Sequence, residues 1–146
     1  IGSDGAYADI LFMPGGGCRT PITRDNVDRR LQTIHMSGKD VYKQAVISML
    51  NASKKALDLA GLTTDDIACV IPHQANLRII EAISERLKIP RERVFVNLES
   101  YGNTSAAAVA IALDEANRTG YIKKGDYILL VVFGGGLTWA SSVMQW

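Results

Sequence analysis

The sequence predicts an α/β fold in which helices pack on a mixed, mostly parallel five-stranded sheet that ends in an antiparallel strand pair. Short apolar runs alternate with helical patterns along the chain, which is typical of a largely parallel sheet. The glycine turn Gly134–Gly136 joins the last two apolar runs, and so short a connection requires antiparallel strands. A chain of 146 residues with 47% apolar and 21% charged residues can bury a core, which excludes a disordered protein.

The N-terminal part is predicted to contain one strand, a polar loop and one long helix. Residues 6–13 form an apolar run typical of a strand, which the proline and glycines after it end. A polar stretch follows to about Gln32 and is expected to be loop. Residues 39–59 place apolar side chains near a 3.6-residue period, which predicts a helix that Gly61 ends in the left-handed conformation.

The C-terminal part alternates strands and helices more regularly. A short apolar run at 68–71 predicts a buried strand that Pro72 ends, and the helix predicted at 76–87 has one apolar face. Small residues fill the helix predicted at 105–118, with Thr104 as its N-cap, so we expect it to lie deep in the structure. The remaining predicted strands are 94–98, 126–133 and 137–145.

The charge balance and the cysteines exclude several classes of protein. Sixteen basic and 15 acidic residues leave a net charge of +1, which gives no reason to expect binding to nucleic acid or to an anionic membrane. Cys18 and Cys69 cannot form a disulfide framework and favour a reduced, cytoplasmic protein. Together with His35 and His73 they lack the spacing of zinc ligands, so no metal site is expected. The start at Ile1, without a signal peptide or initiator methionine, indicates a domain, a proteolytic fragment or one piece of a nicked enzyme.

Three groups with hydrogen-bond donors are expected at one end of the sheet. His73, Asn103 and the turn Gly134–Gly136 each come after a predicted strand. The carboxyl ends of parallel strands meet at one end of a sheet, where ligands bind, so an imidazole, a carboxamide and backbone N–H groups should lie close together. Such donors can stabilise a developing oxyanion or enolate. Each feature also has a plain structural explanation, as a core histidine, a capping asparagine or a tight turn.

Neither cysteine is a strong candidate for a catalytic nucleophile. Cys69 lies in the middle of a predicted strand among apolar residues and is expected in the core. Cys18 lies in a glycine-rich loop beside Arg19, where a reactive thiol is the weaker of two alternatives.

Three motifs resemble those of the β-ketoacyl-acyl-carrier-protein synthase III family. They are Ile-Pro-His-Gln-Ala-Asn-Leu-Arg-Ile-Ile at 71–80, Asn-Leu-Glu-Ser-Tyr-Gly-Asn-Thr-Ser-Ala-Ala at 97–107 and Val-Phe-Gly-Gly-Gly-Leu-Thr-Trp at 132–139. Shorter matches at 3–5, 14–17 and 36–41 occur in the same order, so the similarity runs over the whole chain.

The resemblance implies the thiolase fold, which is built from two similar halves. Residues 1–146 would be the C-terminal half, and the nucleophilic cysteine of the family would lie in an N-terminal half that this chain lacks. The implied enzyme is an acyltransferase that starts fatty-acid elongation by decarboxylative Claisen condensation of an acyl-CoA primer with malonyl-acyl carrier protein. We expect the chain alone to be inactive without the cysteine-bearing half.

The resemblance also implies roles for individual residues. His73 and Asn103 match the pair that stabilises the enolate, while Gly135 and Phe133 match an oxyanion-hole N–H and an aromatic wall beside the cysteine. The positions that match the lining of the substrate tunnel are Gly38, Asn76 and Ile79. The positions that match the docking site for the carrier protein are Gln74, Ala75, Asn76, Leu77 and Arg78, and Lys43 is expected to join them.

The implied partners are the N-terminal half of the same enzyme, acyl carrier protein, acyl-CoA and a second copy in a homodimer. No cofactor is expected beyond the coenzyme A thioester and the phosphopantetheine-bound substrate. A non-catalytic half that binds acyl thioesters or another subunit is an alternative, because the cysteine is missing. Polyketide-priming synthases, hydroxymethylglutaryl-CoA synthases and thiolases share the fold, although the run His73-Gln74-Ala75-Asn76 favours the fatty-acid enzyme.

Overall fold

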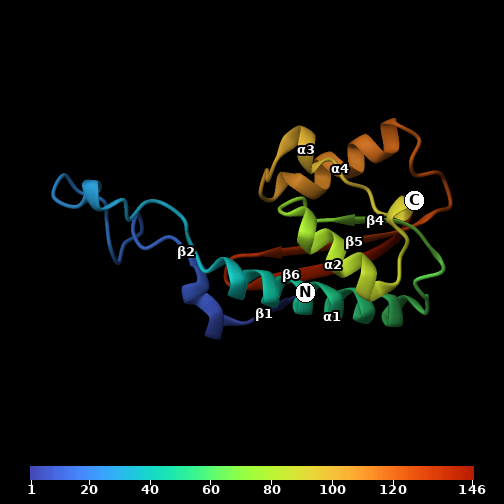
Figure 1. Ribbon diagram of the computed structural model, residues 1–146, viewed down its shortest axis with the longest axis horizontal. Helices are drawn as coiled ribbons and strands as arrows, with labels where there is room; N and C mark the ends of the chain where they lie inside the picture. The colour runs from blue at the N-terminus through green and yellow to red at the C-terminus, as the bar shows by residue number, and fades with distance from the viewer.

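Helices cover both faces of a four-stranded sheet in the computed structural model, which describes residues 1–146 (Figure 1). The strand order is β1-β6-β5-β4. The strands of this sheet are β1 (Gly2–Ser3), β4 (Ile67–Pro72), β5 (Tyr127–Gly134) and β6 (Thr138–Gln145). The helices are α1 (Gly38–Ala60), α2 (Leu77–Leu87), α3 (Leu98–Tyr101) and α4 (Ala107–Arg118). Figure 1 shows α1 and α2 on one side of the sheet and α3 and α4 on the other.

The sheet is mixed, as predicted, but it is not mostly parallel. The strands β4 and β5 pair in parallel, whereas β6 is antiparallel to both β5 and β1. The predicted C-terminal antiparallel pair is confirmed, with Phe133 opposite Trp139 and Gly134 opposite Thr138. The prediction counted one parallel strand too many, because the segment at 94–98 does not join the sheet as a strand.

The segment at 94–98 makes a single parallel bridge, between Val94 and Val70 of β4. A 3₁₀ turn at Arg91–Arg93 precedes it, and α3 begins at Leu98. These two helical turns leave too few extended residues for a strand, which is one reason that the sheet has four strands and not five.

The prediction of a strand at 6–13 is also wrong. The carboxylate of Asp4 accepts a hydrogen bond from the N–H of Ala6 at 2.9 Å and starts a 3₁₀ helix at Gly5–Ile10. Extended backbone is limited to β2 (Leu11–Phe12), which pairs antiparallel with β3 (His35–Met36) in a separate two-stranded sheet. Local capping therefore overrides the apolar pattern of this segment.

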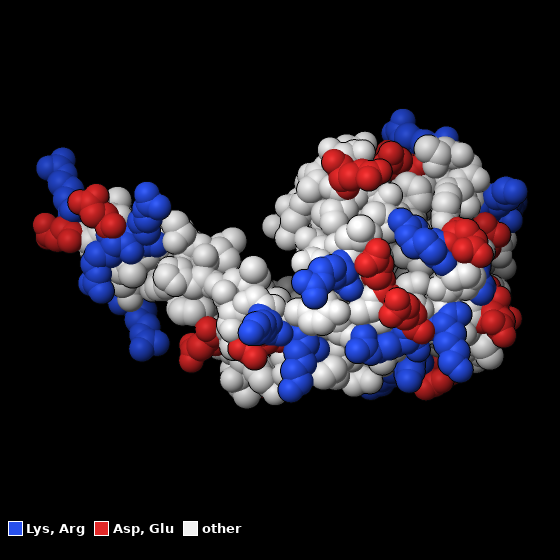
Figure 2. All heavy atoms as spheres, in the orientation of Figure 1, with Lys and Arg blue, Asp and Glu red and all other residues white.

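Residues 13–34 form an arm that projects from the body of the molecule, in blue and cyan in Figure 1. The predicted loop character is confirmed, apart from a 3₁₀ turn at Val27–Arg29. Charged residues of both signs gather on the outer part of the arm, as Figure 2 shows. Met13 and Ile34 at its base are 54% and 75% exposed, so this chain leaves apolar surface there uncovered.

A hydrophobic core lies on each face of the sheet, because side chains on a strand alternate between its two faces. The larger core joins α1, α2 and the sheet through buried side chains that include Met49, Ile83, Leu129 and Val131. The smaller core joins α4 to the other face through Cys69, Ile71, Ala112, Ala116 and Ile128. Only the alanine stripe of α4 is buried, so the deep placement expected for this helix holds for one of its faces.

The predicted end of the long helix is confirmed. Gly61 follows α1 with φ 67° and donates hydrogen bonds to the carbonyls of Asp58 and Leu57. None of the helices is both long enough and apolar enough to cross a membrane.

Candidate active site

The carboxyl ends of β4 and β5 lie at the same end of the sheet. Pro72 is paired with Val131, and the N–H of His73 donates to the Val131 carbonyl at 2.8 Å. His73 therefore lies beside the last residues of β5, of which Phe133 is half-buried. The glycine turn follows directly. The topology thus brings His73 and the glycine turn to the same end of the sheet, as predicted, and Phe133 at the end of β5 lies there as well.

His73 is half-buried, and this burial lowers the pKa of its imidazole below the ordinary 6.5. Removal from water disfavours the charged form of the ring. At neutral pH the imidazole is therefore uncharged, with one nitrogen as a donor and the other as an acceptor.

Asn103 is exposed and lies in the loop between α3 and α4. Its Oδ1 accepts a hydrogen bond from the N–H of Ser105 at 3.1 Å, and its Nδ2 makes no hydrogen bond within the chain. The N–H₂ group is thus free to donate to a ligand. Thr104 does not cap α4 as predicted, because Ala106 occupies the N-cap position. The Thr104 hydroxyl is buried without a partner.

The glycine turn presents a second free donor. The N–H of Gly135 has no acceptor within the chain, and its carbonyl accepts from the Thr138 hydroxyl at 3.1 Å. Gly136 has φ 133°, and a Cβ there would lie 2.8 Å from Thr138 Cγ2, so only glycine fits. The turn therefore holds its backbone in a conformation that leaves the Gly135 N–H available.

Gln74 does not lie on a docking surface, which corrects one sequence prediction. Its side chain is 1% exposed. Its Nε2 donates to the carbonyls of Pro72 and Phe95 at 2.8 and 3.2 Å, and its Oε1 accepts from the N–H of Asn97 at 3.1 Å. Backbone groups therefore surround this carboxamide, and a carrier protein cannot reach it.

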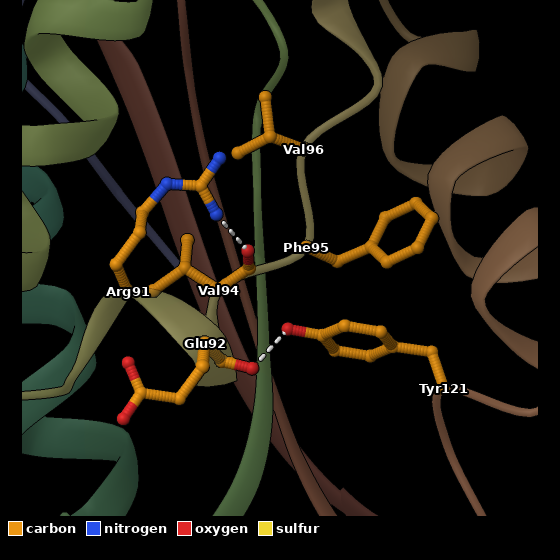
Figure 3. A pocket seen from close by; sticks show the side chains of 6 residues that line it. All are labelled: Arg91, Glu92, Val94, Phe95, Val96 and Tyr121. Atoms are coloured by element: carbon orange, nitrogen blue, oxygen red, sulfur yellow. Dashed lines mark hydrogen bonds between the residues drawn. The ribbon is translucent and has the colours of Figure 1, made fainter.

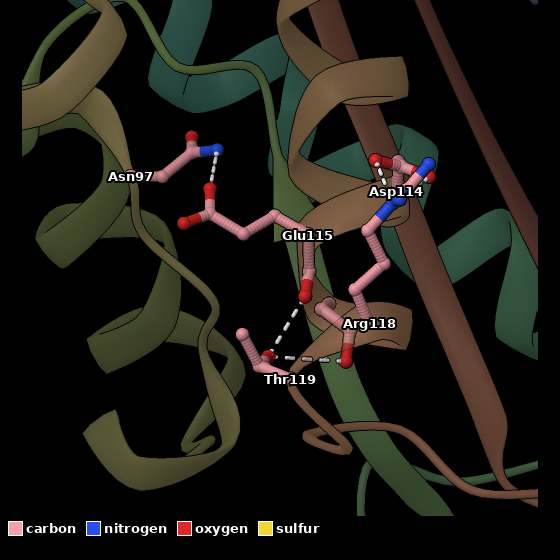
Figure 4. A network of polar contacts seen from close by, with 6 residues as sticks. Asn97, Asp114, Glu115, Arg118 and Thr119 are labelled. Atoms are coloured by element: carbon pink, nitrogen blue, oxygen red, sulfur yellow. Dashed lines mark hydrogen bonds and ion pairs between the residues drawn. The ribbon is translucent and has the colours of Figure 1, made fainter.

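The network continues to α4, as Figure 4 shows. The Nδ2 of Asn97, which is 5% exposed, donates to Glu115 Oε2 at 2.7 Å. On the outer surface of the same helix, Arg118 and Asp114 form an exposed ion pair at 2.8 Å. Sequence reasoning did not single out Asn97 or Glu115, because 18 residues separate them and no periodic pattern relates them.

The start of α2 carries the remaining predicted residues of the site. Asn76 is the N-cap, and its Oδ1 accepts from the N–H of Arg78 at 2.9 Å. Leu77 and Arg78 are exposed, whereas Ala75 and Ile79 are half-buried. Gly38 is exposed at the first residue of α1, and Lys43 is exposed one turn further along.

The sequence did not predict that Tyr42 contacts Arg78. The Arg78 guanidinium carbon lies 5.6 Å from the centroid of the Tyr42 ring. The two residues are far apart in the sequence and on different helices, so only the packing of α1 against α2 shows the pair. Lys43 follows Tyr42 on α1, and its side chain is exposed.

Two other features lie away from these residues. A groove of about 480 Å³ is lined by Arg91, Glu92, Val94, Phe95, Val96 and Tyr121, none of which is a predicted site residue (Figure 3). Burial raises the pKa of the Cys69 thiol to about 12, which fits a core cysteine, and Cys18 is exposed in the arm. The chain has no cluster of three or more possible metal ligands.

Comparisons with known proteins identify the family. Residues 57–146 match the family model described as 3-oxoacyl-[acyl-carrier-protein (ACP)] synthase III C terminal. The β-ketoacyl-[acyl-carrier-protein] synthase III proteins of Caldanaerobacter subterraneus subsp. tengcongensis and Clostridioides difficile are 56% and 51% identical over all 146 residues. The chain covers 44% of each of these relatives, so it spans less than half of their length.

Solved structures agree with this result. The synthase III of Thermus thermophilus matches 99% of this chain with a TM-score of 0.85 and 46% identity, and the chain covers 44% of that structure. A priming β-ketosynthase from the R1128 polyketide pathway matches 99% of this chain with a TM-score of 0.83 and 37% identity, and 42% of it is covered. These matches confirm the predicted thiolase-like α/β fold. The chain therefore belongs to the 3-oxoacyl-[acyl-carrier-protein] synthase III family.

Proposed function

We propose that this chain supplies the enolate-stabilising half of a condensing enzyme that starts fatty-acid elongation. The enzyme would join an acyl-CoA primer to malonyl-acyl carrier protein, and its N-terminal half would provide the nucleophilic cysteine. The observation that carries the proposal is the placement of His73, whose N–H donates to the Val131 carbonyl beside the end of β5, where burial lowers the pKa of its imidazole.

The proposed chemistry needs donors where negative charge develops. Loss of carbon dioxide breaks a C–C bond of the malonyl thioester and moves the electron pair toward the thioester oxygen. The resulting carbanion attacks the carbonyl carbon of the acyl-cysteine, a new C–C bond forms, and the C–S bond breaks to release the thiolate. Donation from His73 and Asn103 to the enolate oxygen stabilises this transition state more than the ground state.

Other residues fit supporting roles in the same reaction. The free N–H of Gly135 is suited to the oxyanion of the acyl-transfer step, with Phe133 as a wall beside it. Gly38, Asn76 and Ile79 would line the path of the pantetheine arm, and coenzyme A and phosphopantetheine enter as parts of the substrates. We also propose a homodimer of the complete enzyme.

Docking of the carrier protein is assigned to the exposed start of α2 and the neighbouring face of α1. Arg78 and Lys43 would supply positive charge to an acidic partner, and Leu77 and Ala75 would supply apolar contact. Gln74 is left out of this surface because it is buried.

A second candidate is the priming step of polyketide synthesis. The likeness to the R1128 priming β-ketosynthase, at 37% identity, favours this alternative. The chemistry at His73 and Asn103 would be the same, and only the primer or carrier would differ. Assays with acetyl, branched and longer acyl-CoA primers would separate the two candidates.

Malonyl decarboxylation by the chain assembled with its cysteine-bearing half tests the proposal. His73→Ala and Asn103→Ala should each lower the rate roughly 10²–10³-fold, the cost of losing one donor to a developing oxyanion. His35→Ala and Asn51→Ala, which remove the same side-chain types from exposed positions, are the matched controls. A rate within a few fold of wild type for either His73→Ala or Asn103→Ala would contradict the proposal, as would full condensation by this chain alone.

A further inference from the structure

The parallel contact between β4 and the segment at 94–97 is interrupted at Pro72. Val70 is bridged to Val94, and its carbonyl accepts from the N–H of Phe95 at 2.9 Å. In a parallel ladder the next step would pair residue 72 with residue 96, and the N–H of residue 72 would donate to the Phe95 carbonyl. Proline has no N–H, so Pro72 cannot make this step.

The Gln74 side chain takes the place of the missing backbone group. Its Nε2 donates to the Phe95 carbonyl at 3.2 Å, and its Oε1 accepts from the Asn97 N–H at 3.1 Å. These two groups belong to the residues on either side of Val96. In a parallel ladder, the residue paired with Val96 would bind the same two groups through its own backbone N–H and carbonyl. The Nε2 group also donates to the Pro72 carbonyl at 2.8 Å, so the same amide holds both segments.

The two segments that Gln74 joins carry the two proposed enolate donors. His73 directly precedes Gln74, and Asn97 precedes α3 and the loop with Asn103. Asn97 is held a second time, through its Nδ2 bond of 2.7 Å to Glu115 on α4 (Figure 4). Asn97, at the start of the segment that carries Asn103, is therefore hydrogen-bonded to Gln74, next to His73, on one side and to α4 on the other.

We propose that Gln74 is a positioning residue that sets the relative placement of His73 and Asn103. Its burial makes each of its hydrogen bonds hard to replace, because water cannot reach the groups that they satisfy. A displacement of about 1 Å between catalytic groups can cost roughly 10²-fold in rate, so a loose ladder step would separate the donors enough to matter. The proposal rests on the proposed function.

The test compares two half-reactions of the assembled enzyme. Malonyl decarboxylation needs both donors, whereas acyl transfer from coenzyme A to the cysteine forms no enolate. Gln74→Met keeps the length of the side chain and removes its hydrogen bonds. We expect decarboxylation to fall roughly 10²-fold, with acyl transfer within a few fold of wild type.

A second variant and a control keep the test decisive if Gln74→Met does not fold. Gln74→Glu has nearly the same shape and can accept from Asn97, but its carboxyl group has at most one donor hydrogen, so it cannot donate to the carbonyls of both Pro72 and Phe95 as the amide does. It should also lower the ratio of decarboxylation to acyl transfer. Ser53→Ala removes a fully buried hydroxyl that donates to Met49 in α1, and it should leave the ratio unchanged.

The outcomes separate this inference from the proposed function. If His73→Ala lowers decarboxylation and Gln74→Met keeps it within about twofold, the inference is overturned and the proposed function stands. Equal losses in both half-reactions, for Gln74→Met and Gln74→Glu alike, would also overturn it, because they indicate a general loss of fold. Full decarboxylation by His73→Ala would instead overturn the proposed function.

Discussion

The guanidinium carbon of Arg78 on α2 lies 5.6 Å from the centroid of the Tyr42 ring on α1. The ring is half-buried and the guanidinium is exposed, so the aromatic face limits the positions that a flexible cation can adopt. This pair connects the packing of the two helices with the proposed binding of a carrier protein.

Substitutions of this pair should weaken carrier binding by different amounts. Tyr42→Leu should raise the Kd roughly 2–5-fold, which corresponds to about 0.5–1 kcal/mol for an exposed cation–π contact. Arg78→Glu should raise it at least about tenfold, because it places a like charge against an acidic partner.

Calorimetric titration of the assembled enzyme with carrier protein at two salt concentrations measures both effects. Added salt should weaken binding to wild type more than binding to Arg78→Glu. Tyr42→Phe keeps the ring and should bind as wild type does. Equal affinities for wild type and Arg78→Glu would refute a docking role for this surface.

The His73 imidazole should titrate below pH 6.5, because burial disfavours its charged form. The unfolded chain then binds the proton more strongly than the folded chain does. The contribution of neutral His73 to the free energy of unfolding is thus present above about pH 6.5 and lost as the pH falls toward the lowered pKa.

A histidine NMR titration, with the resonance assigned by His73→Gln, measures this pKa directly. Urea unfolding at several pH values should also show a smaller loss of stability on acidification for His73→Gln than for wild type. A pKa at or above 6.5 would contradict the predicted neutral donor.

The two cysteines should react very differently with iodoacetamide at neutral pH. Cys18 is exposed, whereas Cys69 is fully buried and its thiol has a pKa raised to about 12. The native chain should therefore gain one adduct, at Cys18, and the chain in denaturant should gain two. Peptide mass spectrometry identifies the sites, and rapid labelling of Cys69 in the native chain would show that the core around α4 opens.

Met49→Ala should destabilise the larger core. The Met49 side chain is 1% exposed and packs between α1 and the sheet, so truncation leaves a cavity and should cost about 2–5 kcal/mol of unfolding free energy. Leu59→Ala, at an 80% exposed position of the same helix, should cost less than about 0.5 kcal/mol. Urea unfolding of the assembled protein measures both, and equal costs would mean that the packing of α1 differs from that described.

Local signals predicted the three long helices α1, α2 and α4 well because helices form from neighbouring residues. The period of apolar residues and Gly61 located α1 to within a residue at each end, and the apolar face of 76–87 located α2 to within a residue at its start. Strands form between distant segments, and the apolar runs at 6–13 and 94–98 became 3₁₀ turns, short extended pieces and a single bridge. Their apolar pattern could not show that a capping Asp4 or an early start of α3 would prevent pairing.

By itself the sequence determined the α/β class, the order of the main elements and the placement of His73 and Gly135 after β4 and β5. Strand ends and glycine turns are set by the nearby residues, so these features follow from the chain itself. The tertiary structure alone decided that Gln74 is buried and replaces the backbone group that Pro72 lacks, and that Arg78 stacks on Tyr42. Both contacts join segments that meet only after the layers have packed, and no local pattern in the sequence records them.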